Sequence, residues 1–212
     1  MIVTLLGGPG AGKGTMARQL AKILQIPTIS TGALLRDEIG SGSELGKEID
    51  QLISKGNFVS DETVSKLLVK RLQQPDCENG YILDGFPRNA TQAEHLPELG
   101  IHLEKALLLD VPNETIIARL AGRRECPHCR ATYHILYNPP VHDGICDECG
   151  SSLNIREDDR PEIISKRLDI YHKETEPLIQ YFSEKNLLAV VQGCVSVEDT
   201  VKQALQALGV KL

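Results

Sequence analysis

A glycine-rich segment near the start of the chain has the residue types and spacing that bind a triphosphate. It reads GGPGAGKGT over residues 7–15 and follows the apolar run from Ile2 to Leu6. Glycines let the backbone N–H groups point into one concavity, and the N-terminus of a following helix adds partial positive charge. Lys13 has the length to reach the outer phosphates of a nucleoside triphosphate. We therefore expect a phosphate-binding loop between a strand and a helix.

The loop departs from the commonest form of this motif at one position. Gly14 follows the lysine, and the hydroxyl comes one residue later, on Thr15. The residue after the lysine therefore cannot ligate Mg²⁺ directly. The variant G-x-P-G-x-G-K-G-T is typical of nucleoside monophosphate kinases.

A second group of polar residues follows another apolar run. That run ends at Leu83, and the sequence continues DGFPR over residues 84–88. Ligands gather at the carboxyl ends of strands in parallel α/β sheets, so Asp84 is placed to bind Mg²⁺ through water. Gly85 permits close approach of the backbone, and Arg88 offers two parallel donors to a phosphate. Taken alone, residues 84–88 could equally form a simple turn. Because the chain also has a phosphate-binding loop, we predict that they form another part of the same binding site.

Two Cys-x-x-Cys pairs lie further along the chain. Cys126 and Cys129 form the first pair, and Cys146 and Cys149 form the second after a gap of sixteen residues. Each short loop can present two sulfurs to one ion, so a tetrahedral Zn²⁺ site of four thiolates is expected. Because such a shell leaves no position for water or substrate, the metal is expected to be structural. The nearby histidines are then bystanders: His128, His134 and His142.

The elements that must position these groups alternate between strand and helix. Apolar runs predict strands at 2–6, 81–83, 105–109 and 187–191, with a fifth short strand near 27–29. Helix-like sequence separates one run from the next. This alternation predicts an α/β fold with a parallel sheet covered by helices on both faces, the arrangement of P-loop NTPases.

Two segments interrupt the alternation. Residues 30–59 have a helical pattern punctuated by Gly and Ser, and residues 122–159 are rich in Cys, Pro, His and turn residues. We interpret both as insertions over the active face. The remaining segments would form one core domain: 1–29, 60–121 and 160–212.

Composition places the chain among ordinary soluble globular proteins and limits its partners. Of 212 residues, 41% are apolar and 25% are charged. No apolar run approaches the roughly 20 residues that span a bilayer, and no signal-peptide pattern is present, so we expect a cytoplasmic enzyme without membrane contact. The net charge of −6 argues against general affinity for nucleic acid. No long apolar seam is left unassigned, which favours a monomer.

The motifs taken together resemble those of the adenylate kinase family, which interconverts ATP and AMP with two ADP. The similarity runs from Met1 to the C-terminal helix. It is carried by residues 7–15, Ser30-Thr31-Gly32, 83–88, Gly122-Arg123-Arg124, Tyr133-His134, Asn138-Pro139-Pro140, Asp158-Asp159 and Lys166-Arg167-Leu168. The resemblance implies Mg²⁺ with ATP. It also implies that 30–59 is the segment that binds the nucleoside monophosphate (NMP) and that 122–159 is a zinc-bearing lid of the long bacterial type.

The resemblance further implies two nucleotide positions. ATP would lie along Gly10, Ala11, Gly12, Lys13, Gly14 and Thr15, near Arg119 and Arg123, with Thr132, Tyr133 and the backbone near Val195. AMP would contact Thr31, Arg36, Asn57, Phe58, Val59, Gly85, Phe86, Pro87, Arg88 and Gln92, with Arg156 and Arg167 reaching the monophosphate and the moving phosphoryl group.

Catalysis by such a site would depend on alignment and on neutralisation of charge. No general base is required, because the attacking phosphate oxygen of AMP is already anionic. The residues expected to act on the reacting groups are Lys13, Asp84, Arg88, Arg123, Arg156 and Arg167. The remaining arginines considered are expected to be solvated surface charges: Arg71, Arg130 and Arg160.

One position departs from the family pattern. The family often has aspartate after Ser-Thr-Gly, and this chain has Ala33. We expect Mg²⁺ to be organised slightly less well, with Asp84 as the principal acidic contact. The reaction type should be unaffected.

Two other readings remain open. One is a kinase for another monophosphate, or one that uses GTP as donor, although the resemblance at Thr31 and Gln92 favours adenine. The other is a zinc-ribbon module that uses nucleotide hydrolysis as a switch on nucleic acid. The acidic balance and the absence of aromatic residues within a basic stripe argue against the second.

Overall fold

A parallel sheet lies at the centre of the computed structural model, which describes residues 1–54, 59–193 and 196–210. Its strands lie in the order β2-β3-β1-β4-β7, and each neighbouring pair is parallel. The bounds are β1 (Ile2–Leu6), β2 (Thr28–Ser30), β3 (Tyr81–Asp84), β4 (Lys105–Asp110) and β7 (Leu188–Gln192). All the predicted strands of the sheet are confirmed, including the short fifth one.

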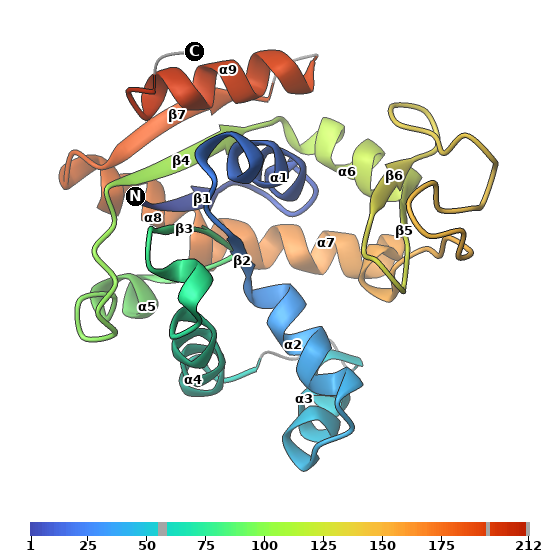
Figure 1. Cartoon of the computed structure of the whole chain (residues 1–212), viewed down its shortest axis with the longest axis horizontal. Coiled ribbons are helices and arrows are strands. Elements are labelled where there is room, and N and C mark those ends of the chain that lie inside the picture. Colours follow the sequence, from blue (N-terminus) through green and yellow to red (C-terminus); the bar gives the residue numbers. More distant parts are fainter. Residues whose placement is uncertain (55–58, 194–195, 211–212) are drawn as a thin grey trace.

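Helices connect the strands and cover both faces of the sheet (Figure 1). The core helices are α1 (Lys13–Leu24), α4 (Asp61–Leu72), α5 (Ala90–Glu94), α6 (Asn113–Gly122), α7 (Pro161–Ile170), α8 (Pro177–Glu184) and α9 (Val197–Ala207). Three short helical turns complete the connections: η1 (Pro75–Cys77), η2 (Glu157–Asp159) and η3 (Tyr171–Thr175). None of the helices among these described segments has the length and apolar character needed to cross a bilayer.

The inner strands β1, β3 and β4 bury both of their faces, which explains why their sequences are largely apolar. Alternate residues point to opposite sides. Leu5 of β1 and Leu107 of β4 pack with side chains from α1, α6, α7 and α9. Leu83 of β3 and Leu108 of β4 pack on the other side with side chains from α4, α5 and α8. Burial of each such leucine contributes about 2 kcal/mol, so two apolar layers hold the strand ends in place.

The first insertion forms two helices that project from the end of β2 (Figure 1). They are α2 (Thr31–Gly40) and α3 (Glu44–Ser54). Ser43 Oγ accepts the N–H of Gly46 at 2.9 Å and so caps α3. A Cβ on Gly46 would lie 2.2 Å from the carbonyl oxygen of Glu38, so only glycine permits this approach of α3 to α2.

The second insertion contains little regular structure. Its strands β5 (Arg123–Glu125) and β6 (Thr132–His134) form an antiparallel pair, and irregular loops follow β6. Its apolar centre is small and consists of Cys126, Ala131, Tyr133 and Cys146, all buried. So few apolar side chains supply little burial energy, which is the condition under which small folds depend on a metal or another cross-link.

Candidate active site

The glycine-rich loop turns directly from β1 into α1, as the sequence indicates. Gly10 and Gly12 have φ values of 81° and 107°, in the region that favours glycine, and Gly12 is the residue before the first turn of α1. The loop therefore presents the N-terminus of a twelve-residue helix at the end of a buried strand.

Lys13 folds back onto this loop. Its Nζ donates hydrogen bonds to the carbonyl oxygens of Gly7 at 2.6 Å and Gly8 at 2.9 Å. Burial lowers the pKa of Lys13 to about 8, an effect that the charge of Asp84 partly opposes. The ammonium group is thus poorly solvated and held by neutral oxygens, so an anion brought to the loop would stabilise its charged form.

Asp84 ends β3 beside the first turn of α1. A Cβ added to Gly14 would lie 3.6 Å from Asp84 Oδ2. The Asp84 charge raises the pKa of both Lys13 and Arg88, although burial lowers both overall. The structure therefore brings the two sequence-predicted groups, the loop and the strand-end carboxylate, into one site.

Carboxylates hold the arginines of the lid and of α7 in fixed positions. Asp159 accepts from Arg123 Nε at 2.7 Å and Nη2 at 2.5 Å, and from Arg167 Nη1 at 3.0 Å. Asp158 accepts from Arg156 Nε at 2.8 Å and Nη2 at 2.7 Å. These bidentate pairs fix the planes of the guanidinium groups before any ligand arrives.

The pKa shifts show that positive charge is concentrated here. Burial lowers the pKa of Arg36, and the charge of Arg156 lowers it further. Burial also lowers the pKa of Arg167, an effect that the charge of Asp158 partly opposes. Burial also acts on Arg156, but its hydrogen bond and charge interaction with Asp158 raise its pKa above the usual value. The pKa of Asp158 falls to about 2, because Arg156 outweighs the opposing effect of burial. The site therefore gathers guanidinium groups from several elements around a few carboxylates, an arrangement that suits highly charged anions.

Arg36 on α2 has an unsatisfied donor within this cluster. Its Nε is buried without a hydrogen-bond partner. A buried donor left unpaired costs about 1–3 kcal/mol, which an anionic ligand would recover.

The four cysteines come together in the second insertion. Sγ of Cys126 lies 3.4 Å from that of Cys149, and Sγ of Cys129 lies 3.4 Å from that of Cys146. All four sulfurs lie within 4.8 Å of one another. Sulfurs around a tetrahedral Zn²⁺ with bonds of about 2.3 Å are about 3.8 Å apart, so this donor set fits that ion.

The two cysteine loops have the same construction. The N–H of Arg130 bonds to the carbonyl of Cys126 at 2.9 Å, and that of Gly150 bonds to Cys146 at 2.9 Å. Arg130 and Gly150 occupy equivalent places and both have positive φ, at 62° and 72°. Within the described residues the group able to hold a metal ion consists of these cysteines, and the expected bystander histidines are outside it.

Comparison with known proteins decides the family. A model of the adenylate kinase family matches residues 5–187. The adenylate kinases of Caldicellulosiruptor bescii and Acetivibrio thermocellus are 47% and 48% identical to the chain, each over the whole of both proteins. That of Clostridium beijerinckii is 45% identical over 99% of each. The chain belongs to the adenylate kinase family.

The reaction of adenylate kinases is reversible phosphoryl transfer from ATP to AMP, giving two ADP. On the side expected for ATP, Arg119 Nη1 donates to the carbonyl of Ala11 at 2.8 Å and so lies against the loop.

The side chain of Tyr133 points toward the cysteine cluster, although Tyr133 was predicted to contact ATP. Its hydroxyl lies 3.5 Å from Cys146 Sγ and accepts the N–H of Asp147 at 2.9 Å, so it supports the cysteine cluster. Only backbone atoms of Tyr133 are then left for the predicted contact, while Thr132 beside it is half-buried.

On the side expected for AMP, hydrogen bonds join the predicted residues. Thr31 Oγ1 and Arg88 Nε both donate to the carbonyl of Gly85, at 2.9 and 2.8 Å. The N–H of Arg88 bonds to Gln92 Oε1 at 2.7 Å. Two other predicted residues, Phe86 and Pro87, are buried, and the Phe86 side chain lies in the core. The carbonyl of Phe86 also accepts from Thr4 Oγ1 at 2.7 Å, so this segment supports the site more than it offers groups to a ligand.

Four other residues were predicted to contact a nucleotide: Asn57, Phe58, Val59 and Val195. Val59 is half-buried just before α4. Asn57, Phe58 and Val195 lie outside the described residues. Their roles stay predictions.

Sequence reasoning missed three acidic residues that organise the site. Asp158 and Asp159 were noted only as a family motif, and Glu125 not at all, although Arg156 Nη1 donates to it at 3.2 Å. The acidic run 157–159 between Arg156 and Arg160 was the available signal. Arg130 was expected to be a solvated surface charge, but it donates to Asp37 of α2 and thereby connects the two insertions.

Proposed function

We propose that this chain catalyses the family reaction with ATP bound along residues 10–15 and AMP bound beside α2 and residues 85–88. The observation that carries the proposal is the meeting of Lys13 and Asp84 with arginines from separate parts of the chain. The charges of Arg88, Arg123 and Arg167 all act on the pKa of Lys13, which supports one shared site. Such a cluster neutralises the negative charge of two nucleotides and of the phosphoryl group between them.

Each cationic group has a distinct part in this proposal. Lys13 and Arg123 would act on the phosphates of ATP, and Arg88 on that of AMP. Arg156 and Arg167 would reach the monophosphate and the group in transit. The carboxylates of Asp158 and Asp159 keep these arginines aligned. Removal of one aimed donor commonly costs about a hundredfold or more in rate.

Two metal ions belong to the proposal. Mg²⁺ would be held by Asp84 through water and, with Ala33 in place of an acid, by few other protein groups. When bound, it neutralises charge on the β- and γ-phosphates of ATP. Zn²⁺ would be held by Cys126, Cys129, Cys146 and Cys149, whose thiol donor set and spacing fit it. Four protein sulfurs leave no position for water or substrate, which supports a structural role.

The decisive experiment offers ATP with AMP, UMP, CMP and GMP separately in a coupled assay, and then AMP with GTP. We expect a strong preference for AMP and ATP. Preference for another monophosphate, or for GTP, would support the neighbouring kinase reading instead. Hydrolysis of ATP without any acceptor, coupled to binding of RNA or DNA, would support the zinc-ribbon switch.

The Lys13→Met variant tests the loop assignment. Lys13 contacts carbonyls of its own loop and no apolar core, so circular dichroism should remain unchanged while turnover is abolished. Near-normal turnover would contradict the assignment.

We also propose a monomer in the cytoplasm. The cytoplasmic location is supported by the cysteines that the structure describes, none of which forms a disulfide. The monomer is supported by the sequence, in which no long apolar seam is left unassigned. Native mass spectrometry and cell fractionation test the two parts separately.

A further inference from the structure

Asp61 connects two side-chain amides at the base of the proposed AMP site. Its Oδ1 accepts from Gln92 Nε2 at 2.6 Å, and its Oδ2 accepts from Asn89 Nδ2 at 3.0 Å. Asp61 is the first residue of α4, whose N-terminus favours a negative charge. Asn89 caps α5 and Gln92 lies in its first turn. One carboxylate therefore ties the starts of two helices together.

The opposite edge of the Gln92 amide is also engaged. Its Oε1 accepts the backbone N–H of Arg88 at 2.7 Å. A carboxylate can only accept and a backbone N–H can only donate. Turning the amide over would place its NH₂ against the N–H and its oxygen against the carboxylate. Since Gln92 is 5% exposed, no water shell is available to compensate. Its partners thus fix one orientation.

This orientation leaves a defined pair of hydrogen-bonding positions for a ligand. The amide NH₂ keeps one hydrogen to donate, and the amide oxygen keeps one lone pair to accept. Adenine offers the matching edge, because its N1 accepts and its 6-amino group donates. Hypoxanthine and guanine offer the reverse, a donor at N1 and an acceptor at O6. A base with a 6-oxo group would need the amide turned over.

We propose that Asp61 is a specificity-determining residue of the monophosphate site: by fixing the amide of Gln92 it selects a 6-amino purine over a 6-oxo purine. The inference rests on the proposed function, in which Gln92 contacts the base of AMP. Asp61 itself does not touch the substrate and acts as a positioning residue through Gln92.

Asparagine at position 61 is a sharp probe, because it keeps size and shape. Its single oxygen can accept from Gln92 or from Asn89, but not from both. Asn89 cannot turn over to adapt, since its Oδ1 accepts the N–H of Gln92 at 2.8 Å. The Asp61→Asn variant therefore opposes a donor with a donor on one side and weakens one of the two constraints that orient the Gln92 amide.

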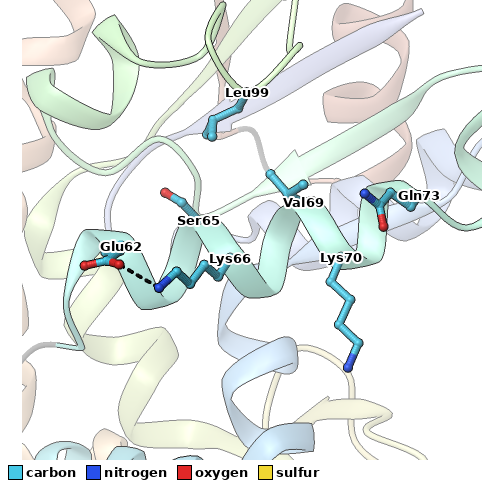
Figure 2. A pocket seen from close by; sticks show the side chains of 7 residues that line it. All are labelled: Glu62, Ser65, Lys66, Val69, Lys70, Gln73 and Leu99. Carbon is cyan, nitrogen blue, oxygen red and sulfur yellow. Dashed lines mark hydrogen bonds and ion pairs between the residues drawn. The ribbon is translucent and has the colours of Figure 1, made fainter.

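A matched control lies one residue further along the same helix. Glu62 is also in the first turn of α4, but its carboxylate is exposed and accepts from Lys66 Nζ at 2.6 Å (Figure 2). It borders a surface hollow of about 440 Å³ lined by residues such as Ser65, Val69 and Leu99. Glu62→Gln removes the same charge from the same helix turn without touching Gln92.

The test compares kcat/KM for AMP with that for inosine monophosphate (IMP), using the purified full-length chain at fixed ATP. IMP differs from AMP only in the hydrogen-bonding edge described above. We expect Asp61→Asn to lower the AMP-to-IMP ratio about tenfold or more, mainly through a higher KM for AMP. The KM for ATP should change less than twofold, and Glu62→Gln should leave the ratio unchanged. If the variant only loosened the site, kcat/KM would fall equally for AMP and IMP and the AMP-to-IMP ratio would not change, which would overturn the inference.

The Gln92→Met variant separates this inference from the proposed function. If Gln92→Met lowers the ratio and Asp61→Asn does not, Gln92 reads the base but Asp61 does not orient it, and the inference is overturned. If neither variant changes the ratio, the assignment of Gln92 to the base of AMP fails first. Thermal melting of each variant confirms that the comparison is made on folded protein.

Discussion

Asp159 accepts two hydrogen bonds from the single guanidinium of Arg123, and its carboxylate is fully buried. Arg123 lies at the start of the lid and Asp159 in η2, thirty-six residues later in the chain. The same carboxylate also accepts from Arg167 of α7. One buried acid therefore sets the positions of two arginines that belong to different elements.

The Asp159→Asn variant should lose this alignment. An amide has one oxygen where the carboxylate has two, so one arginine loses its partner. We expect kcat to fall about tenfold to a hundredfold and the free energy of unfolding to fall by about 1–3 kcal/mol. Steady-state kinetics and chemical denaturation measure the two effects. Glu157→Gln, exposed on the same turn, is the control and should change neither.

Lys13 should couple nucleotide binding to proton uptake. Its pKa of about 8 means that roughly half of the free protein has a neutral lysine at pH 8. Phosphates of ATP favour the charged form and raise the pKa, so binding should take up about half a proton at pH 8 and almost none below about pH 6.5. Calorimetric titration with Mg-ATP in buffers of different ionisation enthalpy measures this number.

Two variants of Lys13 serve as controls for the proton-uptake measurement, because neither has a side chain that titrates near pH 8. Lys13→Arg stays charged throughout and should show no uptake near pH 8, while Lys13→Met has no ammonium group to titrate. For stability, the pKa in the unfolded chain lies near 10.5 and the folded value is lower. The unfolded state therefore holds more protons between about pH 8 and 10.5, and this group makes the protein more stable as pH rises through that window. Equal uptake in wild type and Lys13→Arg would contradict the assignment.

The cysteine cluster should stabilise the lid without taking part in catalysis. Protein prepared under reducing conditions should contain one Zn²⁺ per chain. Cys129→Ser, or a chelator with mild heating, should lower thermal stability while sparing much of the activity at low temperature, because metal binding contributes folding free energy directly. Metal analysis, calorimetry and assays at two temperatures measure this. Immediate loss of turnover with the lid still folded would show that the metal has a catalytic role.

The contact between Arg130 and Asp37 should influence closure more than stability. The pair joins the lid to α2, but both side chains are partly exposed, so it contributes less than about 1 kcal/mol to folding. We expect Arg130→Ala and Asp37→Asn each to weaken binding of a bisubstrate analogue, two adenosines joined through phosphates, by about threefold at low salt. The double variant should be no weaker than either single one.

The same analogue tests the proposed division into moving segments. If 30–59 and 122–159 close over the nucleotides, amide exchange should slow in both, and less so in 122–159 of Arg130→Ala. Additive losses in the double variant would show that the two residues act independently. Protection confined to residues 7–15 would argue against paired closure.

The sequence by itself determined the features that depend on neighbouring residues. Apolar runs marked the strands, the GGPGAGKGT segment marked the turn from β1 into α1, and two Cys-x-x-Cys pairs marked the four-cysteine cluster. These signals are local, because backbone conformation and the pairing of two thiols in one short loop depend on a few adjacent positions.

Only the tertiary structure decided which distant side chains meet. Asp61 and Gln92 are thirty-one residues apart, and nothing in the sequence around either one indicates that their side chains meet. Tyr133 turned toward Cys146, and Arg130 reached Asp37 of the other insertion. Such pairs arise because the packed sheet and helices bring the elements together and buried polar groups then require partners. No local sequence pattern determines which partner each of these side chains takes. In the folded chain few other partners are within reach.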